Sequence, residues 1–142
     1  MLHFDTITTL HAELLAALHA QCFEKKWDKN AFQSLLTLPT TVGLVNESAF
    51  ILCSVCGDEA EILTIGVLPF ARKKGIAYAL LEEMQSFLKR KGVDTFFLDV
   101  NEKNEAARHL YDKFGFKQVG IRKGYYSEKN QKFDALLLKK QI

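Results

Sequence analysis

The apolar residues of this 142-residue chain change their spacing from one segment to the next, and each spacing predicts a different element. Leu2 to Ile7 predicts a short strand. The next segment has helical spacing, with an apolar residue at every fourth position: Leu10, Leu14, Leu18 and Cys22. Asn30 to Leu38 repeats that spacing until Pro39, which cannot continue a helix. A strand and two helices therefore open the chain.

Three strand-like runs follow, separated by short turn sequences. The runs are Thr41 to Asn46, Ala49 to Cys56 and Glu59 to Val67. The turns fall at Asn46-Glu47 and at Gly57-Asp58, and turns this short join antiparallel neighbours. The pattern predicts an antiparallel meander.

The second half returns to helical spacing and then alternates. A helix is predicted from apolar residues at offsets 0, 3, 4, 7, 10 and 11, which are Ala77, Leu80, Leu81, Met84, Phe87 and Leu88. It is expected to end at Lys89-Arg90-Lys91-Gly92, with cations and a glycine at its C-terminal end. Thr95 to Val100 is almost wholly apolar, as expected of a strand covered on both faces. A helix capped by Asn104 and ended by Gly115 follows.

Two final strands are predicted, from Phe116 to about Tyr125 and from Phe133 to Lys139. The whole order is then strand, two helices, three strands, helix, strand, helix, two strands. This is an α/β chain with a mixed sheet, and residues 1–142 are expected to form one domain.

Composition and charge narrow the class of protein. With 48% apolar and 25% charged residues, the chain is expected to be soluble and globular. A net charge of +2 argues against nonspecific nucleic-acid binding, and no apolar run approaches 18 residues. The acidic Asp5 and the lack of a basic start argue against a signal peptide.

Cysteine and histidine usage gives no sign of a metal or redox centre. Cys53 and Cys56 are three positions apart in a predicted strand, so their side chains should lie on opposite faces. With Cys22 they are expected to be free thiols, as in a reducing cytoplasm. The four histidines are dispersed, and no metal is expected.

A basic loop with a glycine joins the strand that ends at Val67 to the following helix, and it reads Arg72-Lys73-Lys74-Gly75-Ile76-Ala77. The first N–H groups of a helix have no partner within it, and the helix dipole favours an anion there. Gly75 would let phosphates approach the main chain closely, which suits a pyrophosphate. Taken alone, the loop could equally be an ordinary strand-to-helix turn with solvated lysines.

The loop resembles motif A of the GNAT superfamily of acetyl-CoA-dependent N-acetyltransferases, because Arg72, Gly75 and Ala77 match its pattern. The predicted order of elements is also the GNAT order from end to end. The chain is most similar to the ribosomal-protein-alanine N-acetyltransferase branch, on matches that run in order along the chain: Ile62 to Val67, Phe97 to Val100, Asn104, Ala106-Ala107, Leu110-Tyr111, Gly115-Phe116, Ile121-Arg122 and Tyr125-Tyr126. The resemblance implies the GNAT acyl-CoA N-acyltransferase fold and acetyl transfer to an amine.

The resemblance also implies roles for individual residues. Tyr111 stands where the family has its general acid. The position usually held by a Glu base is Asp99, one methylene shorter, which leaves three alternatives: Asp99 acting through water, Glu61 on the motif A strand, or a water chain with neither as base.

Cofactor and acceptor residues follow in the same way. Acetyl-CoA is expected at the motif A strand and loop, at the start of the next helix, and at two residues beyond it: Ile65, Gly66, Val67, Arg72, Lys73, Lys74, Gly75, Ile76, Ala77, Tyr78, Asn104 and Tyr111. At the strand, a bulge or splay would leave backbone N–H groups free for the pantetheine arm and the thioester carbonyl. Four aromatic residues flank the region where the family receives its acceptor: Phe23, Trp27, Tyr125 and Tyr126.

The first functional hypothesis is a cytoplasmic enzyme that acetylates the N-terminal amine of a protein, such as a small-subunit ribosomal protein. Its expected partners are acetyl-CoA and the acceptor, without membrane or direct nucleic-acid binding. Acetylation of a small amine or an aminoacyl-tRNA is the second hypothesis. A non-catalytic acyl-CoA-binding module is the third.

Overall fold

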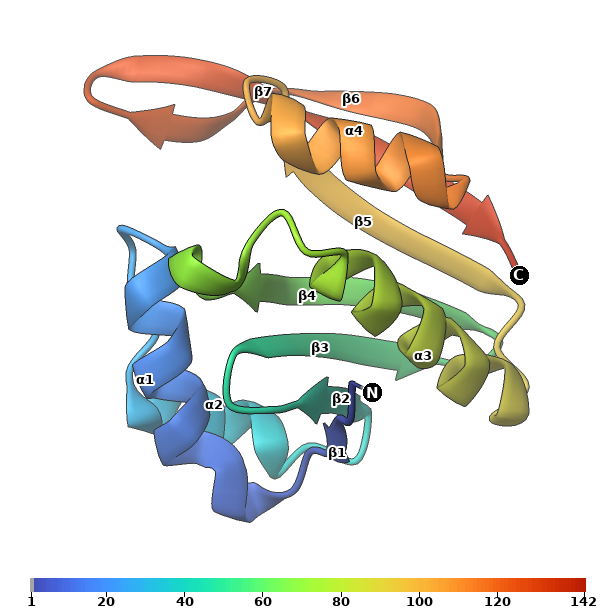
Figure 1. The fold of residues 1–142 in the computed structure, drawn as a ribbon. Coiled ribbons are helices and arrows are strands. Elements are labelled where there is room, and N and C mark those ends of the chain that lie inside the picture. Colours follow the sequence, from blue (N-terminus) through green and yellow to red (C-terminus); the bar gives the residue numbers. More distant parts are fainter. Residues whose placement is uncertain (1) are drawn as a thin grey trace.

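The computed structural model describes residues 2–142, and their helices and strands follow the predicted order (Figure 1). The elements are β1 (Asp5–Thr6), α1 (Ala12–Cys22), α2 (Lys29–Leu36), β2 (Thr41–Val45), β3 (Ala49–Cys56), β4 (Glu59–Val67), α3 (Ile76–Arg90), β5 (Thr95–Asn101), α4 (Glu105–Phe114), β6 (Lys117–Glu128) and β7 (Gln131–Gln141). Short 3₁₀ turns precede α1 and α3 at Thr9–His11 and Pro69–Ala71. The predicted α/β class and element order are confirmed.

The seven strands form one mixed sheet in the order β1-β2-β3-β4-β5-β7-β6. Only β4 and β5 run parallel, and every other neighbouring pair is antiparallel. The predicted meander is therefore confirmed as β2-β3-β4. The βαβ crossover β4-α3-β5 places the helix on the face that also carries α4 (Figure 1).

Side chains alternate along β3 into two separate cores. Ala49, Ile51 and Cys53 join the larger core beneath α3 and α4. Phe50 and Leu52 face the other way, into the smaller core beneath α1 and α2. Because both faces are covered, β3 is a run of buried residues without a polar position from Ala49 to Cys53.

The strand β5 is covered less completely than its sequence predicted. Phe96, Leu98 and Val100 are buried in the larger core. The alternate residues Phe97 and Asp99 are only half-buried on the other face, and neither belongs to the smaller core under α1 and α2. The prediction that Thr95 to Val100 is covered on both faces was thus wrong, because one of its faces carries the half-buried Phe97 and Asp99.

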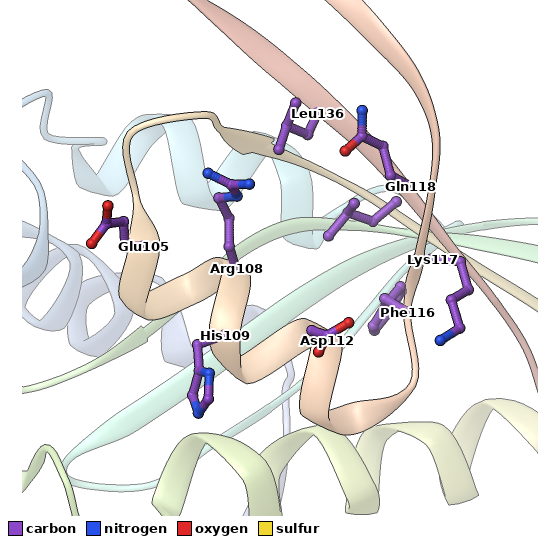
Figure 2. Close-up of a pocket in the computed structure, with 9 residues that line it drawn as sticks. Glu105, Arg108, His109, Asp112, Phe116, Lys117, Gln118 and Leu136 are labelled. Atoms are coloured by element: carbon purple, nitrogen blue, oxygen red, sulfur yellow. The ribbon is translucent and has the colours of Figure 1, made fainter.

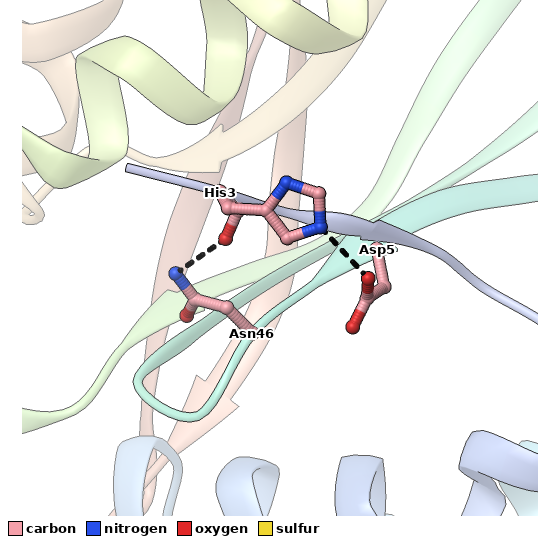
Figure 3. Close-up of polar contacts among 3 residues, drawn as sticks. All are labelled: His3, Asp5 and Asn46. Atoms are coloured by element: carbon pink, nitrogen blue, oxygen red, sulfur yellow. Dashed lines mark hydrogen bonds and ion pairs between the residues drawn. The ribbon is translucent and has the colours of Figure 1, made fainter. Parts of the chain in front are cut away.

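The N-terminal predictions need two corrections. The first strand is only Asp5–Thr6, and His3 before it makes side-chain contacts instead of strand pairing: Asn46 Nδ2 donates to His3 O at 3.3 Å, and His3 contacts Asp5 (Figure 3). In the predicted first helix, Leu10 and Leu14 are exposed: Leu10 lies in the 3₁₀ turn before α1 and is 90% exposed, and Leu14 lies on the exposed side of α1. The helix is rotated so that its buried residues are Ala12, Leu15, Leu18 and His19.

The last two strands are longer than predicted. β6 and β7 continue through polar residues to a tight turn at Lys129-Asn130, where both φ angles are positive at 49° and 65°. Such a turn matches the twist of a two-stranded hairpin. The hairpin projects beyond the end of α4 (Figure 1). Hydrophobic pattern alone could not predict this extension, because the added residues are polar.

Candidate active site

The two parallel strands at the centre of the sheet diverge. β4 and β5 pair with each other only at Glu59–Glu61 and Thr95–Phe97. Beyond these residues both strands continue but no longer pair with each other (Figure 1). A register shift opposite Leu52 and Cys53 leaves Leu63 as an extra residue in β4. The edge of β4 from Ile62 to Val67 therefore has no strand partner on the β5 side, as the predicted splay required.

The predicted pantetheine residues lie on this unpaired stretch. Ile65 and Val67 pair with Ile51 and Ala49 of β3 on one edge only. Gly66 lies against the α1 side of the sheet, where a Cβ would come within 2.7 Å of the Phe50 ring. Glycine is therefore needed at this position for packing, and the backbone edge remains available to a ligand.

The basic loop has the backbone shape of an anion cradle. Lys73 and Gly75 have positive φ angles of 62° and 77°, and Gly75 is the N-cap of α3. A Cβ placed on Gly75 would meet no atom within 4 Å, so the space over the helix N-terminus is open. Lys73 and Lys74 are exposed around it. The loop thus fits a pyrophosphate group.

Arg72 does not offer its side chain to this cradle. Its Nε donates to the carbonyl oxygen of Val67 at 2.8 Å, which closes the loop back onto the end of β4. Any contact of Arg72 with a phosphate would have to come from its other guanidinium nitrogens or from its backbone. The sequence pattern could not separate these roles.

The first turn of α3 joins the cradle to α4. Ile76 is buried in the larger core, and Ala77 and Tyr78 are half-buried beside it. The Tyr78 ring meets Phe114 of α4 edge-on at 5.2 Å, and Lys113 lies 5.5 Å above the Tyr78 ring. Tyr78 therefore packs α3 against α4, so its side chain has a structural role besides any contact with a ligand.

Two predicted residues lie on α4. Asn104 is the N-cap, and its Oδ1 accepts from the Ala107 N–H at 3.2 Å, which confirms the predicted cap. Tyr111 is buried in the larger core, with its ring edge-on to Phe116 at 5.7 Å. Burial raises the pKa of Tyr111, and Cys53 and Tyr126 raise it further. Its phenol is protonated at neutral pH, as a tyrosine is at its ordinary pKa, and burial makes it hold that proton more tightly.

Asp99 belongs to β5, and its side chain lies on the face of the sheet opposite to the larger core that contains Tyr111. It alternates with the core residues Leu98 and Val100, and its side chain is 15% exposed. Burial raises the pKa of Tyr126, and the Asp99 carboxylate raises it further. The Asp99 carboxylate thus affects the pKa of Tyr126, and Tyr126 in turn affects the pKa of Tyr111.

Glu61 occupies a different position. It is exposed, and it pairs with Phe97 at the last point where β4 and β5 are still joined. Asp99 lies two residues further along β5, where the strands have separated. The geometry therefore favours Asp99 over Glu61 as the carboxylate nearest the open edge.

The four aromatic residues predicted for the acceptor form two groups. Phe23 and Trp27, between α1 and α2, stack on the two sides of His19 at 4.4 and 4.9 Å. Tyr125 and Tyr126 lie in β6 and meet edge-on at 5.1 Å. Between residues 2 and 142, no ring contact joins the two groups.

His19 was not expected to matter, yet it organises the segment between α1 and α2. It is 2% exposed, and its Nδ1 accepts from the Trp27 N–H at 3.2 Å. An imidazole that accepts at Nδ1 is neutral with its proton on Nε2. Burial lowers the pKa of His19 from its ordinary value of 6.5, in agreement with this state.

Acid is expected to destabilise the fold through His19. The folded protein resists protonation of His19 and the unfolded chain does not, so stability is full above about pH 6.5 and is lost as the pH falls below it. Thermal unfolding at pH 7.5 and 5.5 should show a smaller drop in Tm for His19→Asn than for the parent. His3→Gln, which removes an exposed histidine, should keep the parent's pH dependence. Equal drops in all three proteins would contradict the assignment.

A pocket of about 340 Å³ lies elsewhere, between the outer side of α4 and the start of β6 (Figure 2). Phe116, Leu136 and Leu138 contribute apolar atoms to it, while Glu105, Arg108 and Asp112 line its α4 side. None of the predicted site residues lines this pocket.

The remaining predictions concern metal, membrane and thiols. Among residues 2–142 no group of three or more His, Cys, Asp or Glu side chains could hold a metal ion. No helix in the same range is long and apolar enough to cross a bilayer. Cys53 is buried and Cys56 exposed, so the predicted opposite faces are confirmed, and both are free thiols, as is Cys22.

Known proteins are similar to this chain in sequence and in the arrangement of their elements. The family model described as Acetyltransferase (GNAT) family matches residues 12–116. The [ribosomal protein bS18]-alanine N-acetyltransferase of Escherichia coli strain K12 is 33% identical over 142 residues, covering 94% of this chain and 95% of that protein. The crystal structure of the ribosomal-protein-S18-alanine N-acetyltransferase from Escherichia coli superposes with a TM-score of 0.90 and 27% identity, covering 99% of this chain and 93% of the other.

A plant protein has the same fold. Arabidopsis thaliana NAA60 in complex with acetyl-CoA superposes with a TM-score of 0.85 and 23% identity, covering 99% of this chain and 98% of the other.

Proposed function

Since this chain belongs to the GNAT family of acetyltransferases, we propose that it transfers the acetyl group of acetyl-CoA to the N-terminal amine of a protein. A ribosomal protein is the proposed acceptor, because the Escherichia coli relative is named for alanine acetylation of bS18. The observation that carries the proposal is the divergence of β4 and β5 between a protonated phenol on one face and a half-buried carboxylate on the other.

Acetyl-CoA is proposed to lie along the unpaired edge of β4. The backbone of Ile65, Gly66 and Val67 would bind the pantetheine arm and polarise the thioester carbonyl. The cradle at Arg72–Gly75 and the first turn of α3, residues 76–78, would hold the pyrophosphate. Asn104, already bonded as the N-cap of α4, would contact the arm from the other side.

The acceptor is proposed to arrive from the face that carries Asp99. Asp99 takes a proton from the ammonium group through a water molecule, because its side chain is one methylene shorter than a glutamate. The free amine then forms a bond to the thioester carbon, and the carbon–sulfur bond breaks. Tyr111 gives its proton to the leaving thiolate, which departs as CoA-SH, and the second proton lost by the attacking nitrogen restores the Tyr111 phenol. Phe23, Trp27, Tyr125 and Tyr126 would hold the first residues of the acceptor.

We also propose how much of the chain forms the catalytic domain and in which compartment the enzyme works. Residues 1–142 act as one catalytic domain, because both cores share a single sheet. The enzyme works in the cytoplasm, where its free cysteines Cys22, Cys53 and Cys56 would stay reduced and where ribosomal proteins are made.

A panel of acceptors tests this function. We expect CoA release with short peptides that carry a free N-terminus, with a kcat/KM that depends on their first residue. The same peptides with a blocked N-terminus should give no release above hydrolysis. A kcat/KM for polyamines or aminoglycosides above that for every peptide would favour a small-molecule enzyme. Binding of acetyl-CoA without transfer to any amine would favour a binding module.

A further inference from the structure

One oxygen of the Asp99 carboxylate is buried without a hydrogen bond. Oδ1 is the only side-chain oxygen or nitrogen found in that state between residues 2 and 142. A buried carboxylate oxygen without a donor costs free energy, so a structure retains one where a donor is available or a ligand completes it. The nearest cation is Arg122, whose Nε lies 3.6 Å from Oδ1, just beyond hydrogen-bond distance.

The pairing of β6 with β7 places Arg122 on the same face of the sheet as Asp99, next to an irregularity in β6. Arg122 pairs with Ala135 and Tyr126 pairs with Phe133, so four steps along β6 span only two along β7. Gly124 adopts a positive φ of 60° within the bulge. A bulge re-aims the side chains on either side of it. Arg122 lies two residues along β6 from Gly120, whose β7 partner Leu137 pairs with Asp99, so its side chain reaches across β7 to Asp99 of β5.

The guanidinium is held from a second side. Its central carbon lies 5.5 Å from the Tyr125 ring, an arrangement that favours a cation above an aromatic face. Tyr125 and Asp99 thus contact Arg122 together, although the arginine side chain is 54% exposed. An exposed ion pair of this kind adds little to stability. A role in the site explains the arrangement better than a role in folding.

We propose that Arg122 is a positioning residue for the catalytic carboxylate, an inference that rests on the proposed role of Asp99. The guanidinium binds Oδ1 and fixes the rotamer of the short side chain, which leaves Oδ2 to receive the acceptor's proton through water. A planar donor with several N–H groups suits this task, because it can hold one carboxylate oxygen while remaining stacked on Tyr125.

Kinetics of Arg122→Gln separate this role from simple substrate binding. We expect kcat to fall about 10- to 100-fold, because the carboxylate loses the charged partner that fixes its rotamer, with the KM for acetyl-CoA unchanged. The KM for the peptide should stay the same or decrease, because the variant removes a positive charge that repels the incoming ammonium. Arg122→Lys should recover part of the lost kcat. An unchanged kcat, or a rise in peptide KM alone, would overturn the proposal.

Lys123→Gln is the matched control. It removes the same charge from the next residue of the same bulge, but its Nζ lies 3.5 Å from Asp134 rather than near Asp99. The control should keep the parent's kcat and peptide KM. A loss of kcat equal to that of Arg122→Gln would mean that the charge of the bulge, and not the contact with Asp99, matters. The Tm of both variants should stay close to that of the parent.

A double-mutant cycle with Asp99→Asn completes the test. If Arg122 acts through Asp99, Arg122→Gln should lower kcat by less than twofold once Asp99 is Asn. A full additional loss in that background would overturn the proposal while leaving Asp99 as the base. Full activity of Asp99→Asn alone would instead contradict the assignment of the base, and Arg122 would lose its positioning role with it.

Discussion

Tyr111→Phe is expected to lower kcat about 100-fold or more, the contribution of a general acid to a proton-transfer step. The phenol is buried on the α4 side of the diverging strands and is protonated at neutral pH. Removing its hydroxyl leaves the leaving thiolate without a donor but preserves the ring contact with Phe116. The measurement is steady-state kinetics with peptide and acetyl-CoA.

Two further measurements distinguish chemistry from packing in this variant. Calorimetry should show acetyl-CoA binding close to that of the parent, and the Tm should change little because the aromatic ring remains. A parental kcat, under conditions where the chemical step limits the rate, would return Tyr111 to a purely structural role in the core.

Asp99→Asn is expected to be as damaging, with kcat/KM for the peptide reduced about 100-fold or more at neutral pH. The amide keeps the shape of the side chain but cannot accept a proton. Asp99→Glu should remain active, because it restores the missing methylene and places the carboxylate nearer the acceptor. The pH-rate profile of each variant with one peptide provides the measurement.

Glu61→Gln is the comparison that decides between the two carboxylates. Glu61 is exposed where β4 and β5 are still paired, so the change should leave kcat/KM within a few-fold of the parent. Loss of activity in Glu61→Gln with a parental profile in Asp99→Asn would place the base on β4. Mild effects of both single changes with a severe double variant would show that the two carboxylates act together.

The sequence was most reliable where periodicity and turn residues agreed. Ala49 to Cys56 and Glu59 to Val67 were predicted with the observed bounds, because Gly57-Asp58 fixes the turn between them. Asn104 and Gly115 likewise marked both ends of α4, since their capping roles are local. In α1, leucines at steps of four suggested a face that includes Leu10, but tertiary packing buries the alternative face.

The site itself depends on features that have little local signal. The separation of β4 from β5 is a relation between strands about 35 residues apart, which periodicity does not encode. The approach of Arg122 to Asp99 joins residues of β6 and β5 across β7, and no local pattern shows it. His19 is one residue in an apolar helix, and only the fold shows that it accepts from Trp27. Resemblance supplied the proposed catalytic residues, and geometry supplied their neighbours.

One measurement tests the central claim most directly. A short peptide with a free N-terminus and one internal lysine is incubated with the enzyme and acetyl-CoA, and fragmentation mass spectrometry locates the added group. The account predicts a single acetyl group on the N-terminal nitrogen, strongly reduced by Tyr111→Phe and by Asp99→Asn. Acetylation of the lysine alone, or no transfer to any peptide tried, would contradict it.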